Sequence, residues 1–420
     1  MNIREDNFFN LVNIANKHDA WMDETINLIA SENRMSPLVA DVLRTDFGNR
    51  VAEGWIGERV FPGIKYYDEI EKYGMNLVCD MFHADFADIR PISGTMANMI
   101  VFSAFTKPGD TIASISISSG AHISMAGTTP RKVFGLNVVE IPFDCENFSI
   151  NIASAIEVIE SAKPKVLVLG GSVLLFSQPI KELVKICKKV GAIILFDAAH
   201  VAGLIAAEQY PNPFYDGADI VTMTVCKTIP GPQHAIILSR NEFADRIKKT
   251  TFPGFLSGHH LHETVASVLA LEEFKIFGKD YARQVLLNAK ALAVCLSGYG
   301  FDVLAKGRGF TDTHMLLVNI SNILPANEAE KILESANIIV NRNMLPNDLS
   351  FSNPSGLRIG TPEITRLGFK EEDMAMVASF IKRLLLDRGD PDDIKDEVIK
   401  FRKAFKSAKY CYEKNEHEKK

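Results

Sequence analysis

The stretch DIVTMTVCKTIPGP, residues 219–232, places a lysine where a β-strand would end. Its first residues are mostly branched and apolar, as in a buried strand, and a turn containing proline and glycine follows Lys227. Such a lysine is either a solvated strand end or a buried amine with a chemical role. Burial lowers the pKa of an ammonium group, which favours attack of the free amine on a carbonyl carbon.

A carboxylate and a histidine precede this lysine in a similar setting. Asp197 follows the apolar run AIILF, where a parallel strand would reach the carboxyl edge of its sheet, and His200 lies three residues further on. Ligands of open α/β sheets bind at this edge. A carboxylate there can keep the ring nitrogen of a pyridinium cofactor protonated, and the histidine can contact the same ring. The alternative is a helix-capping aspartate beside a structural histidine.

A third feature is the change from a strand-like to a helical pattern at Ser93, Gly94 and Thr95. Free backbone N–H groups at a helix start bind phosphate, although simple capping by Ser or Thr is the commoner explanation. An anion seat, an aspartate and a lysine, each at a strand end, together form what a pyridoxal phosphate enzyme needs. The combination is far more specific than any one of its parts.

The elements that must position these residues follow from the apolar pattern. Near-continuous apolar runs alternate with amphipathic stretches such as 179–191, which predicts a buried and mostly parallel sheet in an α/β fold. The strand candidates are 111–118, 165–171, 192–197, 219–223 and 234–238. We expect an N-terminal arm over 1–40, a large cofactor-binding domain over 41–284 and a smaller α+β domain over 285–420.

Composition narrows the class of protein. The 420 residues carry a net charge of −6 and give no basic footprint, so nucleic acid is not an expected partner. No apolar run reaches the length of a membrane span, and the charged N-terminus does not resemble a signal peptide. Six scattered cysteines without a CxxC pair indicate reduced thiols and a cytoplasmic location.

Motifs along nearly the whole chain resemble the serine hydroxymethyltransferase family, and more closely its archaeal branch. They include INLIASEN (26–33), AEGWIGERVFPG (52–63), SGTMAN (93–98), SGAHIS (119–124), LGGS (169–172), DAAHVAGLIA (197–206), KTIPGPQ (227–233), TFPGFLSGHHLH (251–262) and NPSGLRIGTPEITRLGFKEEDM (353–374). The resemblance implies a fold-type I pyridoxal phosphate enzyme and a homodimer with shared active sites. It also implies reversible cleavage of serine to glycine, with one-carbon transfer to a tetrahydropterin, either tetrahydrofolate or tetrahydromethanopterin.

The resemblance further implies roles for residues around the cofactor ring. Lys227 would carry the cofactor as a Schiff base, Asp197 would pair with the ring nitrogen, and His122 would stack on the ring face. Three further residues would lie around the ring hydroxyl and the lysine: His200, Ser172 and Thr224.

The phosphate and the substrate have their own implied ligands. The phosphate would bind at Ser93, Gly94 and Thr95, helped by Gly258 of the partner subunit. Arg358 would bind the substrate carboxylate in a bidentate manner, assisted by Ser31. Glu53 would be the acid/base group near the hydroxymethyl carbon, also reached across the dimer.

The sequence departs from the family pattern at four places, one of which is a pair of adjacent residues, and each place loses a polar group. Val51 and Phe61 stand where the family has tyrosines, and Cys226 and Met125 stand where it has histidines. Val60 replaces the other member of a tyrosine pair. We interpret Cys226 as a small neighbour of the lysine rather than as a reactive thiol.

These departures leave other functions open. A pterin-independent β-hydroxy-amino-acid aldolase or transaldolase is one alternative, and a weakly catalytic cofactor-binding paralogue is another. Glu53 and its surroundings argue against a transaminase. The run GHHLH contains His259, His260 and His262. The spacing of these histidines is the only feature that suggests a metal site, and spacing alone is weak evidence, so we expect no metal there.

Overall fold

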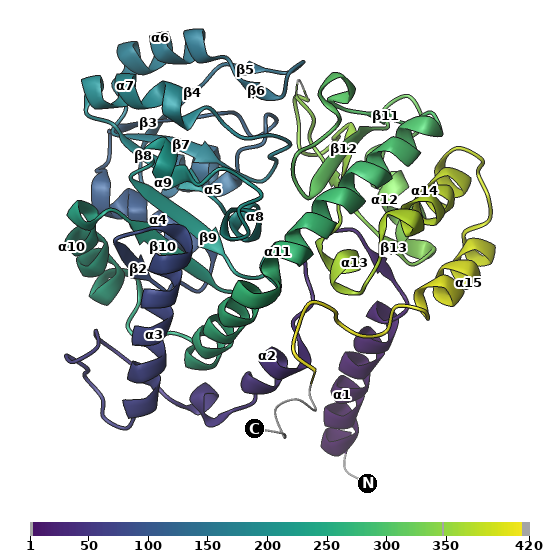
Figure 1. The fold of residues 1–420 in the computed structure, drawn as a ribbon, viewed down its shortest axis with the longest axis horizontal. Helices are drawn as coiled ribbons and strands as arrows, with labels where there is room; N and C mark the ends of the chain where they lie inside the picture. Colours follow the sequence, from purple (N-terminus) through teal and green to yellow (C-terminus); the bar gives the residue numbers. More distant parts are fainter. Residues whose placement is uncertain (1–2, 347, 414–420) are drawn as a thin grey trace.

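The computed structural model describes residues 3–346 and 348–413. Its largest element is a seven-stranded sheet in the order β2-β10-β9-β8-β7-β3-β4 (Figure 1). The strands are β2 (Phe86–Asp88), β3 (Thr111–Ser114), β4 (Asn137–Glu140), β7 (Val166–Gly170), β8 (Ile193–Asp197), β9 (Ile220–Thr224) and β10 (Ala235–Ser239). β10 runs antiparallel to both of its neighbours, and all other pairs are parallel. The predicted α/β fold with a mostly parallel sheet is confirmed.

Both faces of this sheet are covered, as the near-continuous apolar strands predict. In β7, Leu167 and Leu169 belong to one buried cluster while Val166 and Val168 belong to another, as the two-residue period of a strand requires. The first cluster includes side chains of α3 (Lys65–Phe82), α6 (Ile152–Ala162), α7 (Ile180–Val190) and α8 (Ala202–Ala206). The second includes α4 (Gly94–Phe105) and α10 (Asn241–Lys249).

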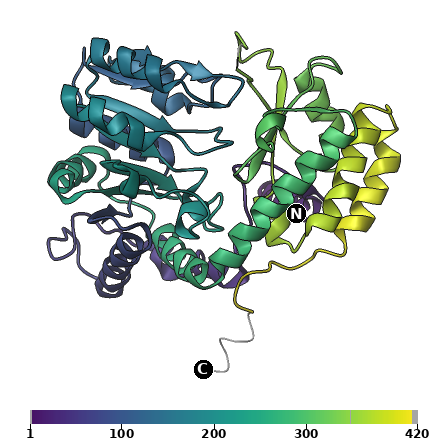
Figure 2. The ribbon, with the colours of Figure 1, turned by 45° about the horizontal axis from the view of Figure 1, so that its top comes forward.

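A second, four-stranded antiparallel sheet lies in the C-terminal part of the chain. Its order is β11 (Asp302–Val303), β12 (Met315–Asn319), β15 (Gly356–Gly360) and β14 (Asn341–Asn343). Its core includes side chains of α12 (Ala326–Ser335), α13 (Pro362–Arg366), α14 (Glu371–Leu385) and α15 (Pro391–Arg402). In Figure 2 this part forms a separate body beside the large sheet.

One long helix, α11 (Leu261–Gly298), joins the two bodies. Its Leu271 and Val285 belong to the core of the large sheet, whereas Leu292 and Leu296 belong to the core of the small one. The predicted division between residues 284 and 285 therefore falls inside a continuous helix, and the domain limits stay a prediction.

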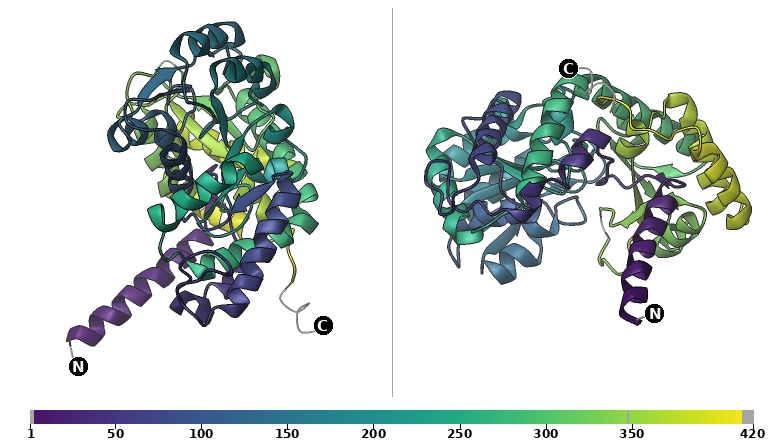
Figure 3. Two further views of the ribbon diagram at one scale, coloured as in Figure 1. Left: turned by 90° about the vertical axis from the view of Figure 1, so that its left-hand side faces the viewer. Right: turned by 90° about the horizontal axis from the view of Figure 1, so that it is seen from below.

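The N-terminal segment begins with a projecting helix and then contacts both bodies. α1 (Ile3–Met22) points away from the body in Figure 3, and β1 (Ile26–Asn27) pairs with β13 (Ile338–Ile339). α2 (Pro37–Val42) then packs on α11. Shorter elements complete the chain: η1 (Asp46–Asn49), α5 (Ile123–Ala126), η2 (Thr129–Val133), β5 (Phe143–Asp144), β6 (Ser149–Ile150), α9 (Pro213–Asp216), η3 (Thr250–Phe255) and η4 (Lys306–Arg308). Within the described ranges, no helix is both long and apolar enough to cross a membrane.

Candidate active site

Three neighbouring parallel strands bring predicted site residues to one edge of the large sheet. Gly170 at the end of β7 pairs in register with Asp197 at the end of β8, and Asp197 pairs with Thr222 of β9. Ser172 follows β7 by two residues, and Thr224 is the last residue of β9. The carboxyl edge of the sheet therefore gathers these side chains, as expected for a ligand site in an open α/β sheet.

Lys227 lies three residues beyond β9, in the turn before β10. Its side chain is partly buried, and loss of solvent around the ammonium group lowers its pKa, while the charge of Asp197 opposes that shift. Its backbone carbonyl oxygen accepts a hydrogen bond from the side-chain amide of Asn33 at 2.5 Å. An amine with a lowered pKa is a better nucleophile at neutral pH.

Asp197 is a buried carboxylate held by neutral donors. Its Oδ2 accepts from Asn98 Nδ2 at 2.8 Å, and its Oδ1 accepts from the backbone N–H of Ala199 at 3.0 Å. Among the described residues no lysine, arginine or histidine forms an ion pair with it. A buried carboxylate without a cationic partner is costly, and a protonated ring nitrogen would supply one.

The imidazole of His122 is oriented by its neighbours. Ser124 donates to His122 Nδ1 from its backbone N–H at 3.2 Å, and Ser124 Oγ lies 2.7 Å from the same nitrogen. Asn98 Nδ2 donates to Ser124 Oγ at 3.0 Å, so one amide connects His122 to Asp197. Burial lowers the pKa of His122, so the ring is neutral with its proton on Nε2.

His200 is fully surrounded and packs against a second histidine. Its ring lies 5.6 Å from the ring of His314 at an interplanar angle of 13°, and the Nδ1 of His200 lies 3.4 Å from the Nε2 of His314. The same Nε2 of His314 is 3.1 Å from the carbonyl oxygen of Ala30, the residue before Ser31. Burial lowers the pKa of His314 to about 3, and the pKa of His200 is also well below its usual range.

Arg358, on β15 of the small sheet, reaches the same region. Its Nη1 donates to the carbonyl oxygen of Ser172 at 2.9 Å, and its Nε donates to Asn341 Oδ1 at 3.2 Å. Both acceptors are neutral, and no carboxylate among the described residues pairs with it. Burial lowers its pKa to about 10, which still leaves the group charged at neutral pH.

The predicted phosphate seat lies beside the end of β9. Ser93 is the N-cap of α4, and its Oγ accepts from the backbone N–H of Met96 at 3.2 Å. A methyl group built on Gly94 would lie 3.0 Å from Thr224 Cγ2, so the helix start is within contact of the strand end. Thr95, the next residue, is partly buried. The N-terminus of α4 thus offers free backbone donors at the same sheet edge.

Three predicted site residues, Ser31, Glu53 and Gly258, have no hydrogen bond to Lys227, Asp197 or Arg358 among the described residues. Ser31 is partly buried, and the carbonyl oxygen of Glu53 accepts from the backbone N–H of Val60 at 3.1 Å. Gly258 is exposed and lies against Val51, whose Cγ1 would be 3.3 Å from a methyl group on the glycine. Their roles stay predictions.

Comparison with known proteins decides the family. A sequence model described as serine hydroxymethyltransferase matches residues 5–381. The chain belongs to the serine hydroxymethyltransferase family. It is 48% identical over 412 residues to a serine hydroxymethyltransferase of Korarchaeum cryptofilum, covering 94% of this chain and 95% of that one. Serine hydroxymethyltransferases of Cenarchaeum symbiosum and Thermococcus onnurineus are 44% and 43% identical, with 94% of this chain covered and 93% and 94% of theirs.

Serine hydroxymethyltransferases are pyridoxal phosphate enzymes with a folate-type co-substrate, and the residues present fit that cofactor. The fit rests on the buried carboxylate of Asp197, which forms no ion pair among the described residues, and on Lys227, whose amine has a lowered pKa. The N-terminus of α4 lies next to the end of β9, at Thr224. Each of these is a group that the cofactor's ring nitrogen, carbonyl carbon or phosphate would satisfy.

The four departures from the family pattern lie in two environments. Val51 and Phe61 are exposed, together with Val60, whereas Met125 is fully buried under the large sheet. Cys226 is buried with its Sγ 3.4 Å from Gln233 Oε1, and burial raises the pKa of its thiol. A protonated thiol is a poor nucleophile, in keeping with a packing role beside Lys227.

The histidines of GHHLH have separate surroundings. His259 is buried, and its Nε2 is hydrogen-bonded to the hydroxyl group of Tyr67. His260 Nδ1 lies 3.0 Å from Glu263 Oε2, and His262 packs near Gly48. Over 3–346 and 348–413, no three histidine, cysteine, aspartate or glutamate side chains gather as metal ligands would.

Sequence reasoning missed Asn98, Asn33 and His314. Asn98 and Asn33 lie in quoted motifs and His314 lies outside them, and the partner of each is distant in the sequence. From the sequence, Asn98 in SGTMAN is predicted only to lie inside a helix. Its contact with Asp197 becomes visible only when α4 is packed against the strands. For Asn98, the signal that could have found it is a polar residue at a buried position of an apolar helix.

Proposed function

We propose that the protein interconverts serine and glycine and passes the one-carbon unit to a tetrahydropterin. The observation that carries this proposal is a pair of buried charged residues, Asp197 and Arg358, which form no ion pair among the described residues and whose charges both act on Lys227. The carboxylate suits a pyridinium nitrogen, and the guanidinium suits an amino acid carboxylate. Both charges need an occupant of the opposite sign.

Residues of the large sheet would hold the cofactor. When bound, pyridoxal phosphate draws electrons from the substrate's Cα, so that a bond at that carbon can break. Asp197 would hold a proton at the ring nitrogen, while Lys227 would provide the amine that holds the cofactor. His122, with its proton on Nε2, would pack on the ring face. Near the ring hydroxyl and the lysine we place Ser172, His200 and Thr224.

The phosphate would occupy the N-terminus of α4. Ser93, Gly94 and Thr95 present backbone N–H groups there, and the helix dipole adds to the attraction. The proximity of Gly94 to Thr224 supports this assignment, because it brings the anion seat to the sheet edge.

Arg358 would bind the substrate carboxylate. Its Nε donates to Asn341 and its Nη1 to Ser172. Nη2, which has no partner among the described residues, and the second hydrogen of Nη1 remain for two hydrogen bonds to the carboxylate. Ser31 would assist, since His314 ties the preceding Ala30 to the site. Glu53 would exchange a proton at the hydroxymethyl oxygen as the bond between Cα and Cβ breaks.

We further propose a homodimer in which Glu53 and Gly258 act on the partner's site. Exposed apolar side chains support this arrangement. Phe8, Phe9 and Leu11 are exposed on the projecting α1, and Val60 and Phe61 are exposed in the segment after Glu53. Apolar surface of this extent is a common mark of a protein interface.

The proposal is tested by serine turnover with each pterin. The purified protein, given serine and either tetrahydrofolate or tetrahydromethanopterin, should form glycine and the one-carbon adduct of at least one pterin. Lys227→Ala should lose this activity, whereas Lys185→Ala, on the exposed face of α7, should keep it. Glycine formation that is indifferent to both pterins, or a Lys227→Ala variant with full turnover, would refute the proposal.

A further inference from the structure

One buried phenol on α11 connects three separate segments. The hydroxyl group of Tyr281 donates to the carbonyl oxygen of Pro362 at 2.9 Å and accepts from Asn33 Nδ2 at 2.8 Å. The same Asn33 amide donates to the carbonyl oxygen of Lys227 at 2.5 Å. A single hydroxyl and a single amide thus join the N-terminal arm, the turn that carries Lys227 and the start of α13.

Each of these segments carries a residue of the proposed site. Asn33 follows Ser31 by two residues, and Pro362 follows Arg358 by four. The turn that contains Lys227 belongs to the large sheet, and Arg358 belongs to the small one. The position of the Lys227 amine relative to Arg358, the proposed ligand of the substrate carboxylate, therefore depends on how these segments are held together.

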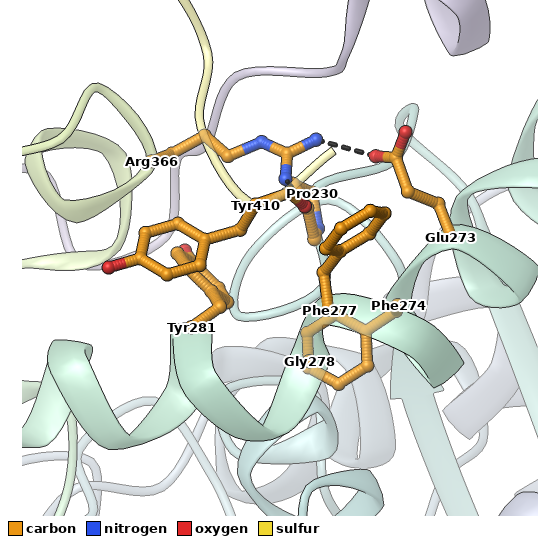
Figure 4. A pocket seen from close by; sticks show the side chains of 8 residues that line it. All are labelled: Pro230, Glu273, Phe274, Phe277, Gly278, Tyr281, Arg366 and Tyr410. Carbon is orange, nitrogen blue, oxygen red and sulfur yellow. Dashed lines mark hydrogen bonds and ion pairs between the residues drawn. The ribbon is translucent and has the colours of Figure 1, made fainter. Parts of the chain in front are cut away.

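Tyr281 is in turn covered by a C-terminal strap, residues 408–412. The ring of Tyr410 lies 5.6 Å from the ring of Tyr281. The carbonyl oxygen of Tyr410 accepts from Arg366 Nη1 at 2.7 Å, and its hydroxyl accepts from Lys370 Nζ at 2.7 Å. Figure 4 shows Tyr410 and Arg366 beside Tyr281, with Pro230 of the Lys227 turn lining the same pocket.

A buried ion pair joins α11 to Arg366 of α13, the residue that also binds the strap. Arg366 Nη2 lies 2.6 Å from Glu273 Oε1, and both side chains are almost fully buried. The backbone N–H of Lys409 donates to the carbonyl oxygen of Arg366 at 2.7 Å, and the ring of Tyr412 packs edge-on against Phe277. The strap lies beyond residues 5–381, the part of the chain that the family model matches.

We infer that Tyr281 is a positioning residue, whose hydroxyl fixes the Lys227 turn relative to the segments of Ser31 and Arg358, and that the strap holds Tyr281 in place. The phenol touches none of the groups to which we assign chemistry. It acts through Asn33 and through the carbonyl oxygen of Pro362. This inference rests on the proposed function only for its effect on turnover, since the link itself is a property of the chain.

The test uses Tyr281→Phe, which keeps the ring and removes the hydroxyl. Tyr299→Phe is the matched control, because Tyr299 caps the same helix, is exposed and has no hydrogen bond from its hydroxyl among the described residues. Hydrogen–deuterium exchange of the backbone is measured on the purified protein, with and without added pyridoxal phosphate. We expect peptides covering 225–233 and 30–35 to exchange about tenfold faster or more in Tyr281→Phe, and unchanged in the control.

Two further variants approach the link from other sides. Asn33→Ala removes the amide that joins Tyr281 to Lys227, and Tyr410→Ala removes the ring that covers Tyr281. Both should raise exchange in the same two peptides. In an active enzyme, Tyr281→Phe should lower kcat for serine about ten- to a hundredfold while changing KM less, because the carboxylate ligands remain.

The inference would be overturned if the backbone of residues 225–233 exchanged in Tyr281→Phe at the wild-type rate, even if the melting temperature of the variant were lower. A uniform rise in exchange across the whole chain would also overturn it, because that marks a merely structural role. If the wild-type protein did not turn over serine, the proposed function would fail, but the exchange experiment would still decide on Tyr281.

Discussion

The side-chain amide of Asn98 donates to the buried carboxylate of Asp197, with 2.8 Å between Nδ2 and Oδ2. Thr222 Oγ1 donates to the amide oxygen of the same Asn98 at 2.7 Å, which fixes the orientation of the amide. Asp197 is therefore positioned by a neutral group on α4. Its negative charge is left for a cationic ligand, here the ring nitrogen of the proposed cofactor.

Replacing Asn98 by alanine should weaken the binding of pyridoxal phosphate about tenfold. The variant removes one hydrogen bond to a buried carboxylate, a loss of about 1–3 kcal/mol. It also removes the hydrogen bond from Asn98 to Ser124, the residue that orients the imidazole of His122. The dissociation constant is measured by absorbance titration of the apoprotein. Asn322→Ala, at an exposed position without a hydrogen bond from its side chain in the described structure, serves as the control. Equal affinity in Asn98→Ala and wild type would contradict this role.

Arg358→Lys should raise KM for serine about ten- to a hundredfold and affect kcat less. Lysine keeps the positive charge but lacks the planar pair of donors of arginine. The substitution also removes the hydrogen bonds to the carbonyl oxygen of Ser172 and to Asn341 Oδ1. Steady-state kinetics with serine at saturating pterin measure both constants. Arg388→Lys, an exposed arginine distant from the site in sequence and bonded to the carbonyl oxygen of Ile323, is the matched control. An unchanged KM in Arg358→Lys would place the carboxylate elsewhere.

The strands and the site's strand-end residues were predictable because both follow from local patterns. A buried parallel strand is an apolar run, and a residue after such a run reaches the ligand edge whatever the remaining fold. Asp197, the last residue of β8, lies where that reasoning about strand ends placed it. The antiparallel direction of β10 is not visible in its own residues. It follows from the short turn after β9, which is too short for a crossover.

What the sequence could not provide is pairing over long separations. Asn98 and Asp197 are 99 residues apart, and Asn33 and Tyr281 are 248 residues apart. Such contacts arise only when whole elements pack, and a buried asparagine or histidine gives no local sign of its partner. The long helix α11 is a related case, because its apolar positions serve two cores and the pattern shows no break at the predicted domain limit.

Charging the projecting helix should dissociate the proposed homodimer. Phe9 is exposed on α1, and burying such a side chain at an interface contributes about 1.5–3 kcal/mol. Phe9→Glu should therefore raise the dimer's dissociation constant about tenfold or more, as measured by light scattering during gel filtration at several concentrations. Asn10→Glu adds the same charge at an exposed polar position and should have a smaller effect. A Phe9→Glu protein that stays dimeric at high dilution would remove α1 from the interface.

His314 should make the protein sensitive to mild acid. Burial lowers its pKa to about 3, whereas an unfolded histidine titrates near the ordinary value of 6.5. Since the native state stays neutral while the unfolded state binds a proton, the stability from neutral His314 is complete above pH 6.5 and is lost as the pH falls towards 3. Between pH 7 and pH 5 this one group should lower the free energy of unfolding by about 2 kcal/mol.

The prediction is tested by urea unfolding of the wild type and of His314→Gln at both pH values. Glutamine cannot titrate, so the variant should lose about 2 kcal/mol less between pH 7 and pH 5 than the wild type does. His18→Gln, at an exposed position of α1, is the matched control and should show the wild-type difference. Equal pH differences in the wild type and His314→Gln would mean that His314 is protonated in the native protein, and that its contact with the carbonyl oxygen of Ala30 is made by a charged ring.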